Sequence, residues 1–303
     1  MIDAPSSTWF TTHPEWHWLV VTYFTLTALA GGCYFLATLL DLMGRPEDRP
    51  IARRAYLAVL PMLAAIGVIL VVDLSRSERF WHLFIENHTW QPIIKPWSPI
   101  SVASWMLPIF GFFALLSFLG ALSDAGKLRW KTAQRFRPPG ALGTAVALLG
   151  SFTALYFAAY PGVLLAVTNR PIWADTPLMG MLFVVSAIAM SAALMVLLGG
   201  GWSRREPGVL ALHRTSVWAL MLQFLVLIAV LVTLGAAARA WLNAWGLVIV
   251  IGVVLLGMLA PIAIDRRRAW FGERSVGTAA LLVLFGGFLL RTVVVFSPEG
   301  IHP

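Results

Sequence analysis

The chain has 303 residues, of which 59% are hydrophobic and 12% charged, and its mean hydropathy is +0.81. A soluble domain carries about 25% charged residues, and no globular core of this size hides so much apolar surface, so the composition excludes a soluble fold. The net charge of +8 does not indicate nucleic-acid binding, because the basic residues form short clusters between long apolar runs, as membrane topology requires.

Eight apolar stretches are long enough to cross a bilayer, for which a helix needs about 20 residues. We predict an all-α integral membrane protein, a single transmembrane domain over 1–303 whose helices form two four-helix bundles. The first helix itself should insert, because the segment before it has no Lys or Arg and the apolar run is too long for a signal peptide. The helices are expected near 17–41, 54–73, 102–123, 141–168, 177–198, 214–236, 241–264 and 276–296.

Lys and Arg are distributed unevenly between alternate loops. The loops after the first, third, fifth and seventh helices hold sixteen, and the other loops hold five. Since basic loops stay in the cytoplasm, both termini are predicted to lie outside. The long outer loop, 74–101, mixes charged and aromatic residues, which favours a short helix in the membrane interface. Seven tryptophans are expected to form an aromatic belt at this outer boundary, namely Trp9, Trp16, Trp18, Trp81, Trp90, Trp97 and Trp173.

Ionisable residues near the ends of the predicted helices have ordinary explanations in most cases. Asp41 and Asp265 end helices beside arginine clusters and should be solvated. Arg291 lies inside the last helix, where it would either extend towards water or pair with a carboxylate such as Asp73. The two helical histidines, His17 and His213, fall at opposite faces, which argues against a transmembrane haem.

The single cysteine, Cys33, cannot build an iron–sulfur cluster or a thiolate zinc site. We therefore expect no haem, no iron–sulfur cluster and no metal site in this chain. Any electron carrier would belong to a partner or be a diffusible molecule, and no complete active site is expected from this chain alone.

Three polar residues are predicted to share one depth near the outer face: Tyr23 in the first helix, Asp73 at the end of the second and Tyr160 in the fourth. A quinone head group needs a hydrogen-bond donor at each carbonyl, a residue that exchanges protons and an apolar slot for its tail. The competing interpretation is structural, because a buried Tyr usually donates to a nearby carbonyl.

Several motifs resemble the NrfD/PsrC family, the membrane subunits of polysulfide-reductase-like complexes, over about residues 15–200. They are Trp16-His17-Trp18, Ala28-Leu29-Ala30-Gly31-Gly32, Asp73-Leu74-Ser75-Arg76, Arg79-Phe80-Trp81-His82, Ser98-Pro99-Ile100-Ser101, Ser104-Trp105, Tyr160-Pro161-Gly162-Val163-Leu164-Leu165-Ala166 and Asn169-Arg170-Pro171-Ile172-Trp173. The last four helices match only in hydropathy.

The resemblance implies a quinone-reactive anchor of a respiratory oxidoreductase complex in the bacterial inner membrane. It implies menaquinone or ubiquinone near the outer face, an iron–sulfur partner subunit there, and through that partner a molybdopterin-type or other catalytic subunit. Family sites use residues at the positions of Tyr160 and Asp73, and these would be the catalytic residues here. The chain departs from the family pattern at Val20 and Tyr23, where that pattern has Asn and His.

On this hypothesis Tyr160, Tyr23 and His17 orient the head group, while Asp73 exchanges protons with the outer water, directly or through Arg76. For His17 the alternative role is packing at the boundary of the membrane. A different class of function is a secondary transporter, although such proteins usually show inverted repeats and polar sites at the midplane. A further alternative is a passive anchor that holds partners and binds no quinone.

Overall fold

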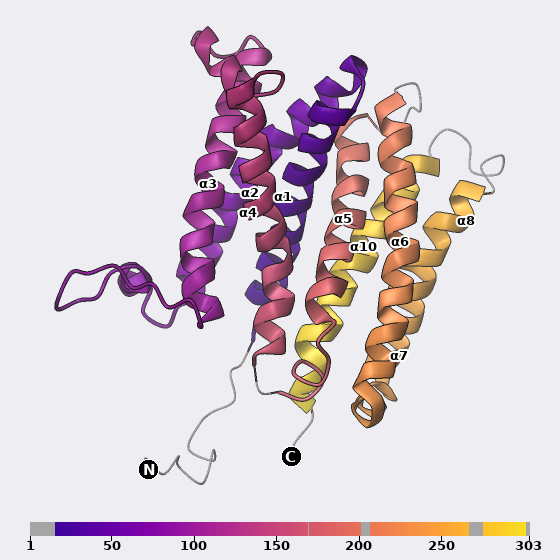
Figure 1. Cartoon of the computed structure of the whole chain (residues 1–303). Coiled ribbons are helices and arrows are strands. Elements are labelled where there is room, and N and C mark those ends of the chain that lie inside the picture. Colours follow the sequence, from indigo (N-terminus) through magenta and orange to yellow (C-terminus); the bar gives the residue numbers. More distant parts are fainter. Residues whose placement is uncertain (1–15, 169, 201–206, 267–274, 301–303) are drawn as a thin grey trace.

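Long helices make up nearly all of the described chain in the computed structural model, which covers residues 16–168, 170–200, 207–266 and 275–300 (Figure 1). Within these ranges there is no strand, and eight helices are long and apolar enough to cross a membrane. The predicted all-α membrane fold with eight spans is therefore confirmed. Trp9 and the basic residues of 201–206 and 267–274 lie outside the described residues, as does the side chain of Asp265.

The spanning helices are α1 (Trp18–Met43), α2 (Arg49–Asp73), α3 (Pro99–Asp124), α4 (Ala141–Ala166), α5 (Met179–Leu198), α6 (Pro207–Leu234), a continuous run of α7 (Ala244–Leu247), η6 (Val248–Leu259) and α8 (Ala260–Arg266), and α10 (Ser275–Phe296). Short helical turns lie in the connections at η2 (Pro46–Asp48), η3 (Ser77–Leu83), η4 (Lys131–Phe136) and η5 (Gly235–Trp241), and η7 (Ser297–Gly300) follows the last span. The middle of the seventh span, η6, is a π-helix.

The third span begins at Pro99, three residues earlier than the sequence predicts. Ser98 caps this helix, since its hydroxyl accepts a hydrogen bond from the Ser101 backbone N–H at 3.4 Å. Pro99 occupies the first turn, where its missing N–H costs nothing. The outer loop is therefore shorter than expected, and its one helical turn is η3.

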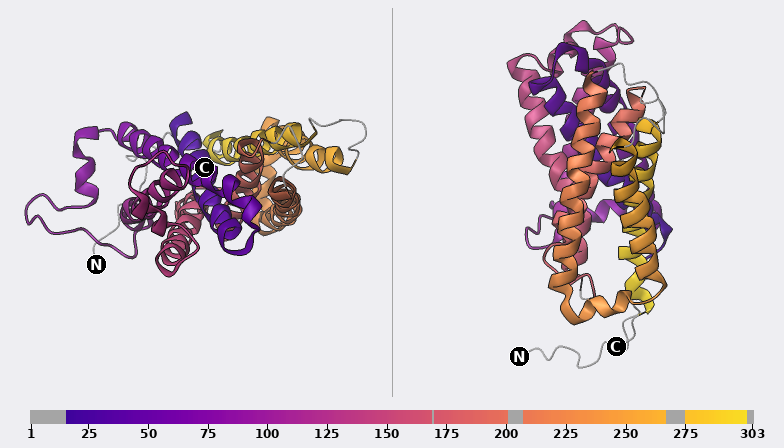
Figure 2. Two further views of the ribbon diagram at one scale, coloured as in Figure 1. Left: turned by 90° about the horizontal axis from the view of Figure 1, so that it is seen from above. Right: turned by 90° about the vertical axis from the view of Figure 1, so that its right-hand side faces the viewer.

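The helices stand in two groups, α1–α4 and α5–α10, with α1 and α5 packed against each other between them (Figures 1 and 2). Gly31 faces the backbone of α4 at Ala154, and Gly32 faces Ser191 of α5, so a side chain at either glycine would collide with a neighbouring helix. Ser191 also donates from its hydroxyl to the Ala28 carbonyl at 3.2 Å. Small residues thus let α1 approach two helices closely, as in other membrane bundles.

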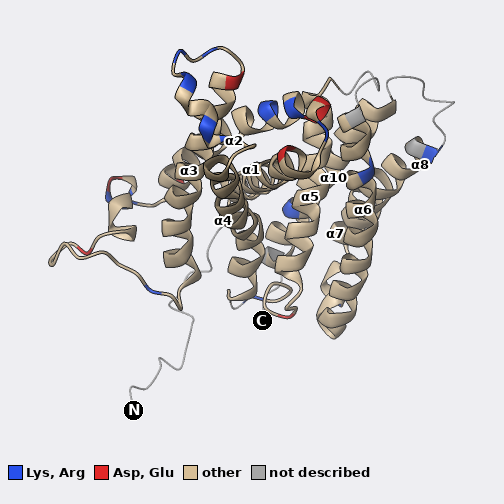
Figure 3. Ribbon diagram, turned by 45° about the horizontal axis from the view of Figure 1, so that its top comes forward, with Lys and Arg blue, Asp and Glu red and all other residues tan. Residues whose placement is uncertain are grey.

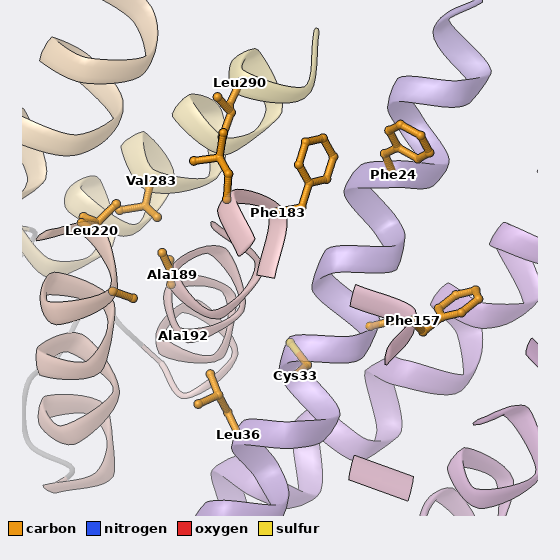
Figure 4. Packing of buried hydrophobic residues seen from close by; sticks show 14 of the residues in the cluster. Phe24, Cys33, Leu36, Phe157, Phe183, Ala189, Ala192, Leu220, Val283 and Leu290 are labelled. Carbon is orange, nitrogen blue, oxygen red and sulfur yellow. The ribbon is translucent and has the colours of Figure 1, made fainter. Parts of the chain in front are cut away.

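Aliphatic and aromatic side chains fill the contact between the two groups (Figure 4). The figure shows Phe24 and Cys33 of α1, Phe183 of α5 and Leu290 of α10 within this core, and all four are buried. Large apolar side chains also cover the outer surface of the bundle, where a soluble protein would place charges. Exposed examples are Phe112, Phe152, Leu225 and Val232. Such a surface requires lipid as its solvent.

Most Lys and Arg residues gather at the end of the bundle away from the chain termini (Figure 3). At that end Arg137 donates two hydrogen bonds of 2.6 Å to Asp41 and one of 2.7 Å to Asp124. The Asp41 side chain is fully buried, so the expectation of a solvated helix end was wrong for this residue. Burial opposes the charge of Arg137, but its hydrogen bonds with Asp41 and the charges of Asp41 and Asp124 hold its pKa above the ordinary value.

The expected aromatic belt is only partly observed. Trp18, Trp90 and Trp97 are exposed. Trp173, in contrast, is fully buried and donates from its indole N–H to the Val294 carbonyl at 2.5 Å, with the Trp16 ring 4.6 Å away. Trp173 therefore joins α10 to the start of α1. It lies at the end of the bundle where it was predicted, but it packs inside the protein and does not face the lipid interface.

The Arg137 cluster gives the first testable prediction. Arg137→Ala should lower the free energy of unfolding by about 3–5 kcal/mol, because it leaves the buried Asp41 carboxylate without a counter-charge. Thermal unfolding in detergent measures this loss. Adding Asp41→Asn to the same protein should recover much of it, and Arg135→Ala, an exposed neighbour, should change little. An Arg137→Ala protein as stable as the parent would contradict this account of the inner end.

Candidate functional site

A cavity of about 500 Å³ opens between α1, α2, α3 and α4 at the end of the bundle where α1 begins and α2 ends. Its size is within the range of small-molecule sites, about 300–1,000 Å³. Nearly all of its wall is apolar, and the turn η3 and the loop around it cover one side. It is lined by Tyr23, Thr27, Gly67, Leu70, Val71, Leu74, Phe80, Leu83, Phe84, Ile100, Ala103, Ser104, Leu107, Pro108, Phe157, Tyr160 and Leu164.

Tyr23 and Tyr160 both line this cavity, from α1 and α4 respectively. Tyr23 is five residues from the start of α1 and Tyr160 six residues from the end of α4. At 1.5 Å per residue both side chains arise about 8–9 Å inside their helix ends. The two helices run in opposite directions, so the phenols lie at similar depth, as the sequence predicts.

Neither phenol hydroxyl at the cavity forms a hydrogen bond with any described residue, although only 7% of Tyr23 and 9% of Tyr160 is exposed. Two other buried tyrosines behave differently. Tyr34 is 2.8 Å from the Ser117 hydroxyl and donates to the Val146 carbonyl, and Tyr56 is 3.0 Å from the Thr38 hydroxyl. The structural role expected of buried tyrosines therefore applies to Tyr34 and Tyr56. The two cavity tyrosines keep hydroxyl groups available for a ligand.

Asp73 lies close to this pair without lining the cavity. It is the last residue of α2 and is exposed, and the residue that follows it, Leu74, belongs to the wall. Since Leu74 shares the cavity wall with Tyr23 and Tyr160, Asp73 lies at the same corner of the bundle as the two phenols. A carboxylate in this position can exchange protons with water while remaining next to the apolar chamber.

The two remaining predicted site residues lie outside the cavity wall. His17 precedes the first turn of α1 and is exposed. Arg76 is the residue before η3 and is also exposed. The structure thus brings Tyr23, Tyr160 and Asp73 together and leaves His17 and Arg76 at the surface near that end.

Sequence reasoning missed most of the cavity wall. α3 supplies five of its residues, among them Ser104, and η3 with the loop around it supplies others, among them Phe84. The Ser104 hydroxyl donates to the Ile100 carbonyl of its own helix at 2.8 Å, so it is already satisfied. The segment around Ser104 was an available signal, because Ser104-Trp105 is one of the motifs that resemble the NrfD/PsrC family. Apolar periodicity alone does not separate a cavity wall from a packed core.

The sequence suggested that Arg291 would either extend towards water or pair with a carboxylate, and the structure shows neither arrangement among the described residues. Its side chain is fully buried and forms no ion pair with a carboxylate of the described residues. It donates from Nε to the Phe24 carbonyl at 3.3 Å, and from Nη1 to the Ser186 hydroxyl at 3.1 Å and the Gly287 carbonyl at 2.9 Å. The Phe183 ring lies 5.1 Å from its guanidinium carbon. A buried cation therefore contacts α1 directly beside Tyr23.

No group of three His, Cys, Asp or Glu residues in the described ranges could hold a metal ion. What the site offers is an apolar chamber, two phenol donors and a carboxylate at its edge. This arrangement suits a flat, mostly apolar molecule with two acceptor oxygens.

Comparison with known proteins gives three matches. The family model for polysulphide reductase NrfD matches residues 10–299. The protein is 24% identical to a polysulfide reductase chain from Wolinella succinogenes over 302 aligned residues, which cover 94% of both sequences. It is also 24% identical to a selenate reductase subunit from Mesobacillus selenatarsenatis over 106 residues, which is 35% of this protein and 22% of that one.

Proposed function

This chain belongs to the NrfD family of polysulphide reductase membrane proteins, and from that membership we propose that it anchors a respiratory reductase complex and exchanges electrons with a quinone. The proposed site is the cavity between α1, α2, α3 and α4. The quinone would be menaquinone or ubiquinone, dissolved in the lipid of the bacterial inner membrane. The two relatives are named as one chain of a polysulfide reductase and one subunit of a selenate reductase, which supports a role as one subunit among several.

The observation that carries the proposal is the pair of unbonded phenols in an apolar chamber. A quinone has two carbonyl oxygens that accept hydrogen bonds, and Tyr23 and Tyr160 are the donors available to them. The remaining wall suits the ring and the start of an isoprenoid tail. Hydrogen bonds made in such surroundings are stronger than in water, because the local dielectric constant is low.

Proton exchange is the second requirement of quinone chemistry. Oxidation of one quinol to a quinone releases two electrons and two protons, and reduction takes up the same number. A phenol ordinarily titrates near pH 10 and is a poor proton acceptor at neutral pH. We therefore assign proton exchange with water to Asp73, which is exposed and directly precedes Leu74 on the cavity wall. Arg76 and His17 are proposed to border this aqueous route rather than to touch the ring.

The site lies at the end of the bundle that carries few basic residues (Figure 3). By the preference of Lys and Arg for cytoplasmic loops, we propose that this end faces the outside and that both termini lie there. An iron–sulfur partner would dock on the same face, within electron-transfer reach of the ring, and connect it to a catalytic subunit of molybdopterin or another type.

The orientation can be tested with single cysteines. Cys33 is fully buried, so it should give little background labelling. His88→Cys, in the loop after η3, should react in intact cells with a maleimide that cannot cross membranes. Lys131→Cys, in η4, should react only after the membrane is opened. The reverse pattern would place the termini in the cytoplasm and overturn the proposed topology.

Removal of one phenol hydroxyl tests the site. Tyr160→Phe and Tyr23→Phe should each lower turnover with a soluble quinol analogue about tenfold, which corresponds to one hydrogen bond to the ring. The assay uses membranes that contain the assembled complex, and activity with a redox dye that bypasses quinone should be unchanged. Tyr156→Phe is the matched control, because this tyrosine precedes Tyr160 by one turn and does not line the cavity. Normal turnover in both cavity variants, or a purified complex without extractable quinone, would favour the passive anchor.

A substitution at Asp73 tests the proton route separately. Asp73→Asn cannot exchange protons and should lower quinol turnover at least about tenfold. Dye-linked activity and the amount of assembled complex should stay normal. Glu78→Gln, an exposed carboxylate in η3, serves as the control. Quinol turnover at the parental rate in the Asp73→Asn complex would move proton exchange to another group.

A further inference from the structure

One position in the wall of the large cavity carries no side chain, and this is Gly67 of α2. The α2 residues of the wall recur every three or four positions and share one face of the helix, namely Gly67, Leu70, Val71 and Leu74. Leu63, one turn before Gly67 on that face, is buried and does not line the cavity. Gly67 is therefore a notch at the inner limit of a helix face that is otherwise made of bulky apolar side chains.

The packing of the helices does not require a glycine at position 67. Gly31 and Gly162 are needed, because a Cβ at either would lie 2.5 Å from the backbone of a neighbouring helix. A Cβ at Gly67 would meet no described atom within 4 Å beyond its own stretch of α2. Its backbone is helical, and glycine is less favourable in a helix than alanine. Neither packing nor backbone conformation thus accounts for the missing side chain.

Gly67 lies level with the phenols of the site. It is six residues from the end of α2, as Tyr160 is six residues from the end of α4. At 1.5 Å per residue, both arise about 9 Å inside their helix ends. The two helices run in the same direction (Figure 1), so the notch and the Tyr160 side chain lie at similar depth. The open space beside Gly67 is therefore at the level where a ring bonded to the phenols would lie.

Apart from the phenols, the hydroxyl groups of the wall have already used their protons. Thr27 donates to the Tyr23 carbonyl, and Ser104 donates to the Ile100 carbonyl at 2.8 Å. The rest of a ligand's contact with this wall is van der Waals contact with apolar groups. The position of a ring between the two phenols consequently depends on its fit to the shape of the chamber.

We propose that Gly67 sets the size of the ring that this site accepts, because the ring packs against the α2 backbone in the notch. The assignment rests on the proposed quinone function of the cavity. A side chain at position 67 would occupy the same space as a ring bonded to Tyr23 and Tyr160, and it would push that ring away from at least one phenol. Gly67 takes no part in electron or proton transfer, so its role is to determine specificity.

Side chains of increasing size test this role in membranes that contain the assembled complex. Through the series Gly67→Ala, Gly67→Val and Gly67→Leu, the KM for a soluble quinol analogue should rise, at least about tenfold for Leu. Dye-linked activity and the amount of complex should be unchanged, and the Tm should not fall, because the added groups enter open space. Gly111→Leu is the matched control, since Gly111 of α3 also meets open space but does not line the cavity.

Two quinol analogues with the same ring and tails of different length locate the notch along the ligand. Because Gly67 lies at the depth of the phenols, Gly67→Leu should raise the KM for both analogues by the same factor. An increase confined to the long-tailed analogue would place Gly67 beside the tail and overturn the assignment.

Other outcomes also decide against this role. A parental KM in Gly67→Leu, or an equal increase in Gly111→Leu, contradicts it, and so does loss of the assembled complex in Gly67→Leu, because the fold would then need the glycine. Tyr160→Phe tests the proposed function separately. If Tyr160→Phe lowers quinol turnover while Gly67→Leu keeps the parental KM, the quinone site stands and only the role of Gly67 fails. A parent complex that oxidises no quinol analogue overturns both.

Discussion

The constraint on which this structure depends is that a polar group in hydrocarbon must find its partner within the protein or in a ligand. Most polar side chains of the bundle find their partners within the protein. Threonine and serine hydroxyls such as those of Thr38 and Ser191 bond to carbonyls of their own or adjacent helices, and Tyr34 spans α1, α3 and α4 through its two partners. Against this background, polar atoms that lack a partner are informative. Within the part of the chain that the structure describes, these atoms include the hydroxyls of Tyr23 and Tyr160, which line the large cavity.

Charge is handled in two different ways at the two ends of the bundle. At the basic end, Arg137 and Asp41 neutralise each other in a buried pair, and this pair holds the connections between helices 1–2 and 3–4 together. Near the other end, Arg291 is buried without a carboxylate among the described residues. Its partners are a carbonyl of α1, a hydroxyl of α5 and an aromatic ring, which offer dipoles but no counter-charge. The two charges of a buried ion pair stabilise each other by electrostatic attraction. A buried cation without a counter-charge is stabilised only where the surrounding dipoles are held in fixed positions.

The spans and the depth of the site residues could be predicted from the sequence, because both follow from one-dimensional properties. Apolar run length gives the number of helices, and counting residues from a helix end gives the depth of Tyr23 and Tyr160. The partners of Asp41 and Arg291 could not be found this way. Asp41 meets an arginine 96 residues later in the chain, and Arg291 meets a carbonyl of α1 267 residues earlier. Such contacts depend on which helices pack together, and neither hydropathy nor motif spacing carries that information.

Arg291 also shows why stability alone does not account for the outer half of this bundle. Replacing a buried charge with an apolar side chain of similar volume is often neutral or stabilising, and this guanidinium keeps one nitrogen, Nη2, without an acceptor among the described residues. Its Nε bonds the carbonyl of Phe24, the residue after Tyr23, so the charge lies against the helix that carries Tyr23, although Arg291 itself does not line the cavity. A fixed cation there favours negative charge in its surroundings, and the low dielectric constant of the core extends that influence. This end of the bundle thus carries a buried positive charge against α1 and an exposed carboxylate at the end of α2. This polarity is set by the fold before any ligand binds.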